Sequence, residues 1–249
     1  MADALRMTNE DCLPPRSVVI TFDDGYIDNY ELAFPVLKAL NLPASFYIPT
    51  SGLENGYLWY DQVVTLIEEC PLKRWVHHVS PELNDKTHKL DLLNATVSKV
   101  KTLKLNERKA YLNKILIDSE APEPKRCIMS AEQVLDLHRN GFEIGGHTHD
   151  HPILSLEDEK SSSQQISMNK DILQNIIDKE IIGFAYPNGQ NEDFQQKDID
   201  ILNGFGFEYA VTTVRGGNSK DTNPFELYRI TPYGADKMRF IKNISDVLF

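Results

Sequence analysis

Two groups of chemically capable side chains stand out in the sequence, and each follows a segment with the pattern of a buried strand. Asp23 and Asp24 end the segment SVVITFDD. His147, His149 and His151 follow the segment FEIGG within the cluster HTHDH. A pair of acids after a strand is also typical of a plain turn, because Asp-Gly suits tight turns. A histidine group can equally lie in solvent, so each group alone leaves both interpretations open.

Taken together, the two groups have the composition of an open metal site. Imidazole and carboxylate are ordinary zinc ligands, and an open site leaves positions for water and a substrate oxygen. His147 and His151 are four residues apart, so a helical turn would bring both rings to one side. One aspartate could then hold the metal while the other takes a proton from water. The residues therefore predict metal-assisted chemistry at a strand end.

The elements that must position these residues alternate between strands and helices. Strand patterns are followed by helical ones along most of the chain, and the last helical pattern covers 235–248. The strand patterns lie at 18–22, 43–50, 142–147, 181–187, 207–214 and 227–234. Such alternation predicts an α/β fold of about seven strands, either a parallel barrel or an open doubly wound sheet. Strand ends of a parallel sheet meet at one edge, where the acids and histidines can converge.

The helical segments differ in how clearly apolar spacing and capping residues indicate them. The segment from Tyr30 carries Leu32, Val36, Leu37 and Leu40 at helical spacing, which predicts an amphipathic helix. The segment SAEQVLDLHRNG begins with a capping-box pattern and ends at a glycine. Residues 71–126 are polar and lysine-rich, with helical patterns but no convincing strand. We interpret about 71–128 as a helical insertion within one domain that covers 1–249.

The charge and the apolar content of the chain limit the kinds of molecule it can bind and the compartments it can occupy. The 249 residues carry a formal net charge of -11, which argues against a nucleic-acid surface and is compatible with a neutral or cationic substrate. No stretch approaches the ~20 apolar residues of a membrane span. The first residues lack the apolar region of a signal peptide. We therefore expect either a cytoplasmic protein or a chain trimmed of its leader, and the compartment stays open.

Three ordered motifs carry a resemblance to a known family. They are TFDDGY at 21–26, HTHDH at 147–151 and FAYPNG at 184–189. In this order and spacing the sequence resembles the polysaccharide deacetylases of carbohydrate esterase family four, whose catalytic unit is the NodB homology domain. The resemblance covers about residues 13–234. It implies a distorted parallel (β/α) barrel of about seven strands, a divalent metal that is usually zinc, and hydrolysis of N-acetyl groups on an amino-sugar polymer or oligomer.

The resemblance also implies roles for particular residues. Asp23 matches the general base, and the metal ligands match Asp24, His147 and His151. The backbone donor to the oxyanion falls at Asn188. The hydroxyl residue that supports the histidine loop falls at Thr148, whereas His149 and Asp150 fall at variable positions, so we expect these two to be solvated or to lie behind the ligands.

Two departures from the family pattern affect the expected mechanism. An arginine that orients the base in many members is replaced by Ala185, and we expect Arg229 to reach Asp23 from a neighbouring strand end, at about 2.7–2.9 Å. Members also carry a late histidine as general acid, but no histidine follows His151. The leaving amine must then be protonated by another group or by water. A surface ion pair is the plain alternative for Arg229.

The sequence thus predicts a metal-dependent polysaccharide deacetylase that releases acetate. Two alternatives remain, namely an inactive metal-containing carbohydrate-binding domain and an amidohydrolase acting on a small non-sugar amide. Four aromatic residues could form a wall against a sugar or could equally be core, and these are Tyr26, Trp59, Tyr60 and Tyr186.

Overall fold

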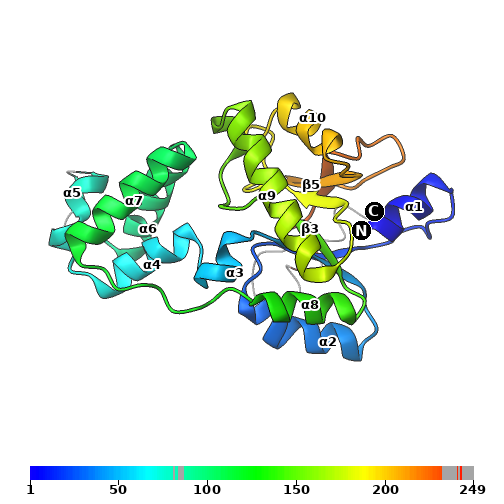
Figure 1. The fold of residues 1–249 in the computed structure, drawn as a ribbon, viewed down its shortest axis with the longest axis horizontal. Helices are drawn as coiled ribbons and strands as arrows, with labels where there is room; N and C mark the ends of the chain where they lie inside the picture. Colours follow the sequence, from blue (N-terminus) through cyan, green and yellow to red (C-terminus); the bar gives the residue numbers. More distant parts are fainter. Residues whose placement is uncertain (81, 84–86, 232–239, 241, 243–249) are drawn as a thin grey trace.

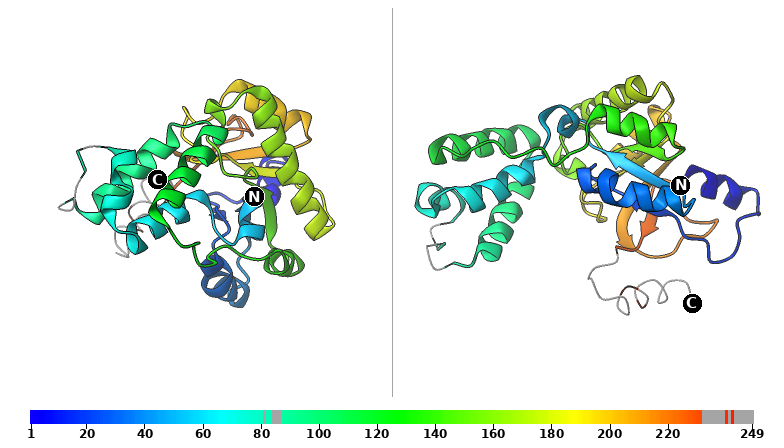
Figure 2. Two further views of the ribbon diagram at one scale, coloured as in Figure 1. Left: turned by 60° about the vertical axis from the view of Figure 1, so that its left-hand side comes forward. Right: turned by 90° about the horizontal axis from the view of Figure 1, so that it is seen from below.

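A computed structural model of the chain describes residues 1–80, 82–83, 87–231, 240 and 242. In this part of the chain six parallel strands form one sheet in the order of the sequence. The sheet curls into a half-barrel, with helices packed on its outer face (Figures 1 and 2). The strands are β1 (Ile20–Phe22), β2 (Ala44–Ile48), β3 (Glu143–Gly146), β4 (Gly183–Ala185), β5 (Tyr209–Arg215) and β6 (Leu227–Arg229).

The expected α/β barrel-like fold is confirmed, with six strands in the described residues where the sequence predicts about seven. The predicted closing helix at 235–248 lies almost wholly outside the described residues. Before the sheet, the chain forms helix α1 (Ala2–Asn9), which the sequence patterns did not indicate.

The helices outside the sheet bury one continuous apolar core against it. Phe46, Ile144 and Phe184 extend from neighbouring strands, and Leu137 and Leu173 meet them from helices. The capping box predicted at Ser130 is present at the start of α8. The helices beside the sheet are α2 (Phe34–Ala39), α3 (Ser51–Asn55), α8 (Ala131–Arg139), α9 (Glu159–Ile177) and α10 (Gln196–Gly204), with short turns η1 (Asn29–Ala33) and η3 (Leu154–Leu156).

The apolar face expected for the helix after Tyr30 is wrong. The helix is interrupted by the π-helical turn η1, and Leu32 and Val36 are 70% and 57% exposed. Leu40 is 62% exposed as well, so these three residues, spaced four apart, share the face of the helix that points to solvent. Phe34 and Leu37 face the core, so Leu37 is the one of the four expected residues that lies on the buried face.

A lobe of helices lies beside the half-barrel, joined to it by the chain after β2 and before β3 (Figure 1). It has apolar clusters of its own, built around Leu66, Trp75, Ile115 and Val100. We call residues 59–119 the helical lobe. Its elements are α4 (Trp59–Glu69), η2 (Leu72–Arg74), α5 (Val76–Val79), α6 (Lys89–Lys101) and α7 (Leu105–Ser119). The lobe thus begins at Trp59, and its status as an insertion within a single domain stays a prediction.

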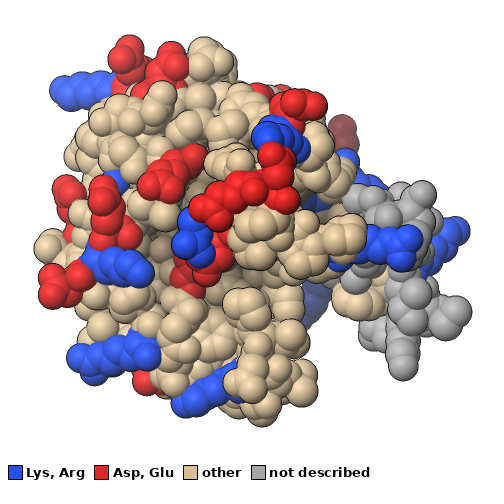
Figure 3. Space-filling view, turned by 90° about the vertical axis from the view of Figure 1, so that its right-hand side faces the viewer, with Lys and Arg blue, Asp and Glu red and all other residues tan. Residues whose placement is uncertain are grey.

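The surface opposite the lobe carries charges of both signs. In Figure 3, acidic and basic side chains lie close to one another, and acidic side chains gather near the middle of this face. Among the described residues, no helix combines the length and the apolar character that crossing a membrane requires.

Candidate active site

The residues singled out in the sequence meet at the carboxyl edge of the sheet. A pocket at this edge lies between the sheet and the helical lobe. Because all strands are parallel, the segments that follow β1, β3 and β4 open into the same space. The predicted residues lining the pocket are Asp23, Asp24, His147, His151 and Asn188.

A sharp turn after β1 lets both aspartates reach the pocket. Asp24 has a φ of +69° and Gly25 a φ of +67°, so two successive residues are left-handed. Such a conformation is costly for most side chains, although Asp tolerates it better than most and glycine adopts it freely. A side chain at Gly25 would also lie 3.3 Å from Ile48 Cδ1. The Asp-Gly pair is therefore both a turn and the support of a site.

The histidine loop converges without the helical turn that the spacing predicts. Residues 147–153 form no helix, and the chain reverses through left-handed Thr148 and His151, at φ values of +62° and +54°. The two imidazole rings still meet, with centroids 4.8 Å apart. The prediction was correct in that the rings converge but wrong in how they do so, because backbone reversal replaces helical periodicity.

A buried asparagine from α9 fixes this loop. Asn169 Oδ1 accepts a hydrogen bond from the His147 N–H at 3.1 Å, and Asn169 Nδ2 donates to Thr148 O at 2.6 Å and to Ile48 O at 2.9 Å. Asn169 is fully buried. The Thr148 hydroxyl bonds the carbonyl of His147. Sequence reasoning missed Asn169, although a polar residue on the buried face of an amphipathic helix was a usable signal.

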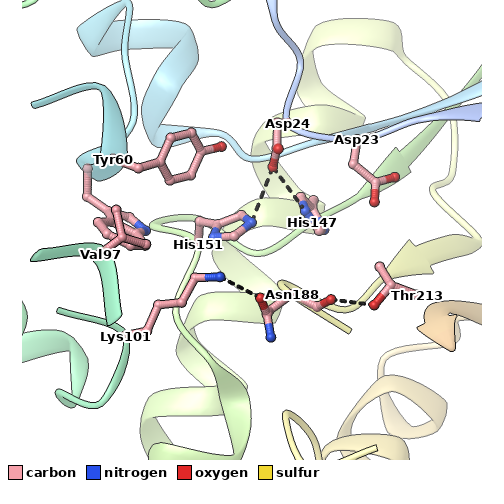
Figure 4. A pocket seen from close by; sticks show the side chains of 10 residues that line it. Asp23, Asp24, Tyr60, Val97, Lys101, His147, His151, Asn188 and Thr213 are labelled. Atoms are coloured by element: carbon pink, nitrogen blue, oxygen red, sulfur yellow. Dashed lines mark hydrogen bonds and ion pairs between the residues drawn. The ribbon is translucent and has the colours of Figure 1, made fainter. Parts of the chain in front are cut away.

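Asp24, His147 and His151 have the geometry of a metal centre. One ligand atom from each lies within 4.8 Å of the others. Asp24 Oδ1 lies 3.3 Å from His147 Nε2 and 3.2 Å from His151 Nε2, and both contacts are drawn in Figure 4. Neither imidazole is aligned to donate a hydrogen bond, so this buried oxygen has no donor among the described residues. A cation between the three groups would satisfy it.

The tautomer of His147 also suits a metal. Its Nδ1 lies 2.7 Å from Ala185 O, and since a carbonyl can only accept, Nδ1 carries the proton. In the neutral ring, Nε2 then presents its lone pair to Asp24. Ala185, which stands where the resemblance leads one to expect an arginine, thus orients the His147 ring through its main-chain carbonyl.

The pKa shifts at this site favour a bound cation. Burial raises the pKa of Asp24, but the two imidazoles more than offset this and hold it below its ordinary range. Burial lowers the pKa of His147, yet Asp24 and Asp23 raise it overall. The pKa of His151 is lowered, chiefly by burial, which favours its neutral form. A divalent cation would take the place of the proton that this negative site attracts.

Arg229 forms the predicted contact with Asp23. Its two terminal nitrogens donate to the two carboxylate oxygens, each at 2.7 Å. Arg229 Nε donates to Thr212 O at 2.6 Å, and a further bond reaches Thr21 Oγ1 at 3.3 Å. Burial lowers the pKa of Arg229, but Asp23 raises it overall, so the guanidinium stays charged. The contact is present, and the role of the pair in catalysis stays a prediction.

The third motif holds Asn188 in a fixed, left-handed conformation. Its φ is +63°, and its carbonyl accepts from Thr213 Oγ1 at 2.6 Å. Its side chain donates to Asp193 Oδ2 and accepts from Lys101 Nζ at 2.7 Å (Figure 4). Within the described residues the Asn188 N–H has no acceptor, so it is available as the backbone donor that the sequence predicts.

The helical lobe supplies the other wall of the pocket. Trp59, Tyr60, Val97 and Lys101 come from α4 and α6 and face the metal ligands across the pocket. In the described part of the chain, the Trp59 indole nitrogen and the Tyr60 hydroxyl are buried without hydrogen-bond partners. A buried donor without a partner is costly, so each of these two atoms calls for an explanation.

The four aromatic candidates thus separate into two sets. Trp59 and Tyr60 line the pocket. Tyr186 is core, because it is 1% exposed and stacks on Phe194 with centroids 3.9 Å apart. Tyr26 hydrogen-bonds Asp61 at 3.0 Å and does not line the pocket.

An arginine from the lobe clamps the histidine loop from behind. Arg108, 4% exposed, donates to His151 O at 2.9 Å and to Asp150 O at 2.6 Å, and its guanidinium lies 5.0 Å from the Trp59 ring centroid. Asp150 also pairs with Lys109 at 2.7 Å. The sequence offered no signal for Arg108, because its partners are main-chain groups of a loop distant in the chain.

Comparisons with known proteins agree with this architecture. The family described as polysaccharide deacetylase matches residues 10–210. The chain is 19% identical over 227 residues to the Bacillus subtilis (strain 168) protein named "Putative polysaccharide deacetylase YxkH", covering 91% of this chain and 55% of that protein. It therefore spans about half the length of this curated relative.

Two solved structures share the fold at low sequence identity. One is the Streptococcus pyogenes deacetylase PplD in complex with acetate, at 18% identity and a TM-score of 0.59, covering 92% of this chain and 70% of that one. The other is IcaB from Ammonifex degensii, at 18% identity and a TM-score of 0.58, covering 98% and 84%. With the family match extending over most of the chain, the chain belongs to the polysaccharide deacetylase family.

Proposed function

We propose that this chain hydrolyses N-acetyl groups on an amino-sugar polymer or oligomer and releases acetate, with one divalent metal, zinc in the first instance, held by Asp24, His147 and His151. The observation that carries the proposal is the buried Asp24 Oδ1, which lies between two imidazole nitrogens and has no hydrogen-bond donor among the residues described. Beside it, Arg229 pairs with Asp23. Membership of the family supports the same reaction class.

The protein groups have separate tasks in this reaction. A divalent metal would supply positive charge that polarises the acetyl carbonyl and lowers the pKa of a water. Asp23, oriented by Arg229, accepts a proton from the attacking water. The Asn188 N–H donates to the oxygen that becomes negative when the carbonyl carbon turns tetrahedral. Trp59 Nε1 and Tyr60 Oη offer donors to the sugar hydroxyls on the lobe side of the pocket.

The proposal is tested by measuring acetate release from three substrate classes, with the protein loaded with zinc. These are N-acetylated chitooligomers, polymers of acetylated glucosamine and small non-sugar amides. We expect turnover on at least one sugar substrate, and its loss in Asp23→Asn. Asp171→Asn, an exposed change on α9, is the matched control. Turnover on small amides alone, or binding of sugar without acetate release, would contradict the proposal.

A further inference from the structure

The pocket contains one proton donor that the proposed function leaves unused. Apart from Asp23, Asp24, His147 and His151, two of the described lining residues carry a titratable proton, Tyr60 and Lys101. Burial and the charge of nearby Asp24 raise the pKa of Tyr60 far above that of a free phenol, so its hydroxyl releases a proton poorly. A lysine ammonium carries a transferable proton at neutral pH. Among the lining residues that the structure describes, Lys101 is therefore the remaining donor.

Lys101 is held in place at the pocket wall. It is the last residue of α6, and its Nζ donates to Asn188 Oδ1 at 2.7 Å. Asn188 is itself fixed by Asp193 and Thr213, so the acceptor that anchors the ammonium is rigid. In the view of Figure 4, Lys101 and Asp23 lie on opposite sides of the metal ligands. One bond to Asn188 leaves two N–H groups of the ammonium for a ligand.

Amide hydrolysis needs an acid at such a position. An amine leaves a tetrahedral carbon readily only when its nitrogen is protonated, so a group that holds a proton must lie within reach of that nitrogen. No histidine follows His151 in the sequence. We propose that Lys101, contributed by the helical lobe, is the general acid that protonates the leaving amine; this inference rests on the deacetylase activity proposed above.

The proton transfers balance as follows. Asp23 takes one proton from water as the water oxygen bonds the acetyl carbon and the carbonyl electron pair moves to oxygen. The C=O bond then re-forms, the C–N bond breaks with its electron pair on nitrogen, and Lys101 Nζ gives that nitrogen a proton. Acetic acid and a free amine result. Lys101 regains a proton from solvent and Asp23 loses one to solvent, so no co-reactant is needed.

Two substitutions separate proton donation from charge. Lys101→Met removes the transferable proton and the positive charge. Lys101→Arg keeps a cation and a donor for Asn188, but a guanidinium does not release its proton near neutral pH. Each is assayed in the zinc-loaded chain on an N-acetylated chitooligomer and on 4-nitrophenyl acetate, whose phenolate leaves without protonation. We expect both variants to lose ~10²–10⁴-fold in kcat on the oligomer. Rates on the ester, KM for the oligomer and zinc content should remain close to wild type.

The controls make each outcome decisive. Lys89→Met, an exposed change at the other end of α6, should leave both rates unchanged. If Lys101→Arg restores oligomer turnover, or if ester and oligomer rates fall together, Lys101 acts through charge or structure and the inference is wrong. A wild-type protein that cleaves the ester but no N-acetyl sugar would instead overturn the proposed function, and the inference with it.

Discussion

At the residue scale, the two neighbouring aspartates of TFDDGY are separated by their environments. Asp24 points between two imidazoles, and one of its buried oxygens has no hydrogen-bond donor in the described part of the chain. Asp23 is gripped on both oxygens by Arg229. A carboxylate between two imidazole nitrogens can share a cation with them, whereas one paired with a guanidinium is held in one orientation by two hydrogen bonds. Adjacent positions thus acquire different chemistry from the groups around them.

This separation predicts opposite effects of two isosteric changes. Asp23→Asn should keep the metal and lose ~10²–10⁴-fold in turnover, because a base is removed while the ligands remain. Asp24→Asn should weaken metal binding, since one of three protein ligands loses its charge. Elemental analysis after dialysis, together with acetate release, measures both. Full metal occupancy in Asp24→Asn would show that the carboxylate is not a ligand.

The arginine fork predicts that lysine cannot replace it. Arg229→Lys retains one positive charge but loses the planar pair of hydrogen bonds, so Asp23 becomes free to rotate. We expect kcat to fall by ~10–100-fold with metal content unchanged. Arg139→Lys, an exposed change on α8, is the matched control. Unchanged kcat in Arg229→Lys would show that Asp23 is oriented by another group.

At the scale of elements, two structural units share the pocket. The strand ends supply the proposed metal ligands, base and oxyanion donor, and the helical lobe supplies two aromatic residues and a lysine. The lobe is fixed to the strand loops by buried contacts, including the Arg108 bonds and a bond from the Leu105 N–H to Glu157 at 2.6 Å. A change within the lobe can therefore reach the metal ligands without touching them.

Arg108→Met tests this connection. The change keeps much of the apolar stem but leaves the carbonyls of Asp150 and His151 without their charged donor, which should cost about 2–4 kcal/mol of stability. We expect zinc affinity, measured by chelator competition, to fall by ~10–100-fold because the loop carrying His151 loosens. Lys109→Met removes only the partly exposed pair with Asp150 and should cost less than about 1 kcal/mol. Equal zinc affinities in the two variants would contradict the clamp.

The sequence predicted those features that depend on local pattern. Strand ends, the Asp-Gly turn and the capping box at Ser130 follow from short-range rules, and the contact of Arg229 with Asp23 follows from strand ends sharing one edge. Lys101 and Arg108 were not predicted, because they reach the site only through the packing of the lobe on the barrel. The buried face of the helix after Tyr30 was mispredicted because two sets of apolar residues fit the helical period there, and the spacing does not show which set faces the core.

At the scale of the whole molecule, the curled sheet has two ends, β1 and β6. Arg229, at the end of β6, reaches across to Thr21 on β1 and to Asp23 directly after it. The same guanidinium that grips the proposed base therefore connects the first strand of the half-barrel to the last. Its side chain is 12% exposed and that of Asp23 is 24% exposed, so the contact lies near the surface of the molecule.

The rate of deacetylation should consequently depend on whether β1 and β6 stay in contact through Arg229. Separating the end strands by a small local opening would release Asp23 long before the helices or the central strands unfold, because such openings cost less than global unfolding. In a urea titration we expect acetate release to decline at lower urea than the far-ultraviolet circular dichroism signal. Zinc content followed in parallel should persist past the first loss of activity, since its ligands follow β1 and β3 rather than β6. Coincident loss of all three signals would mean that the two end strands separate only when the entire fold does.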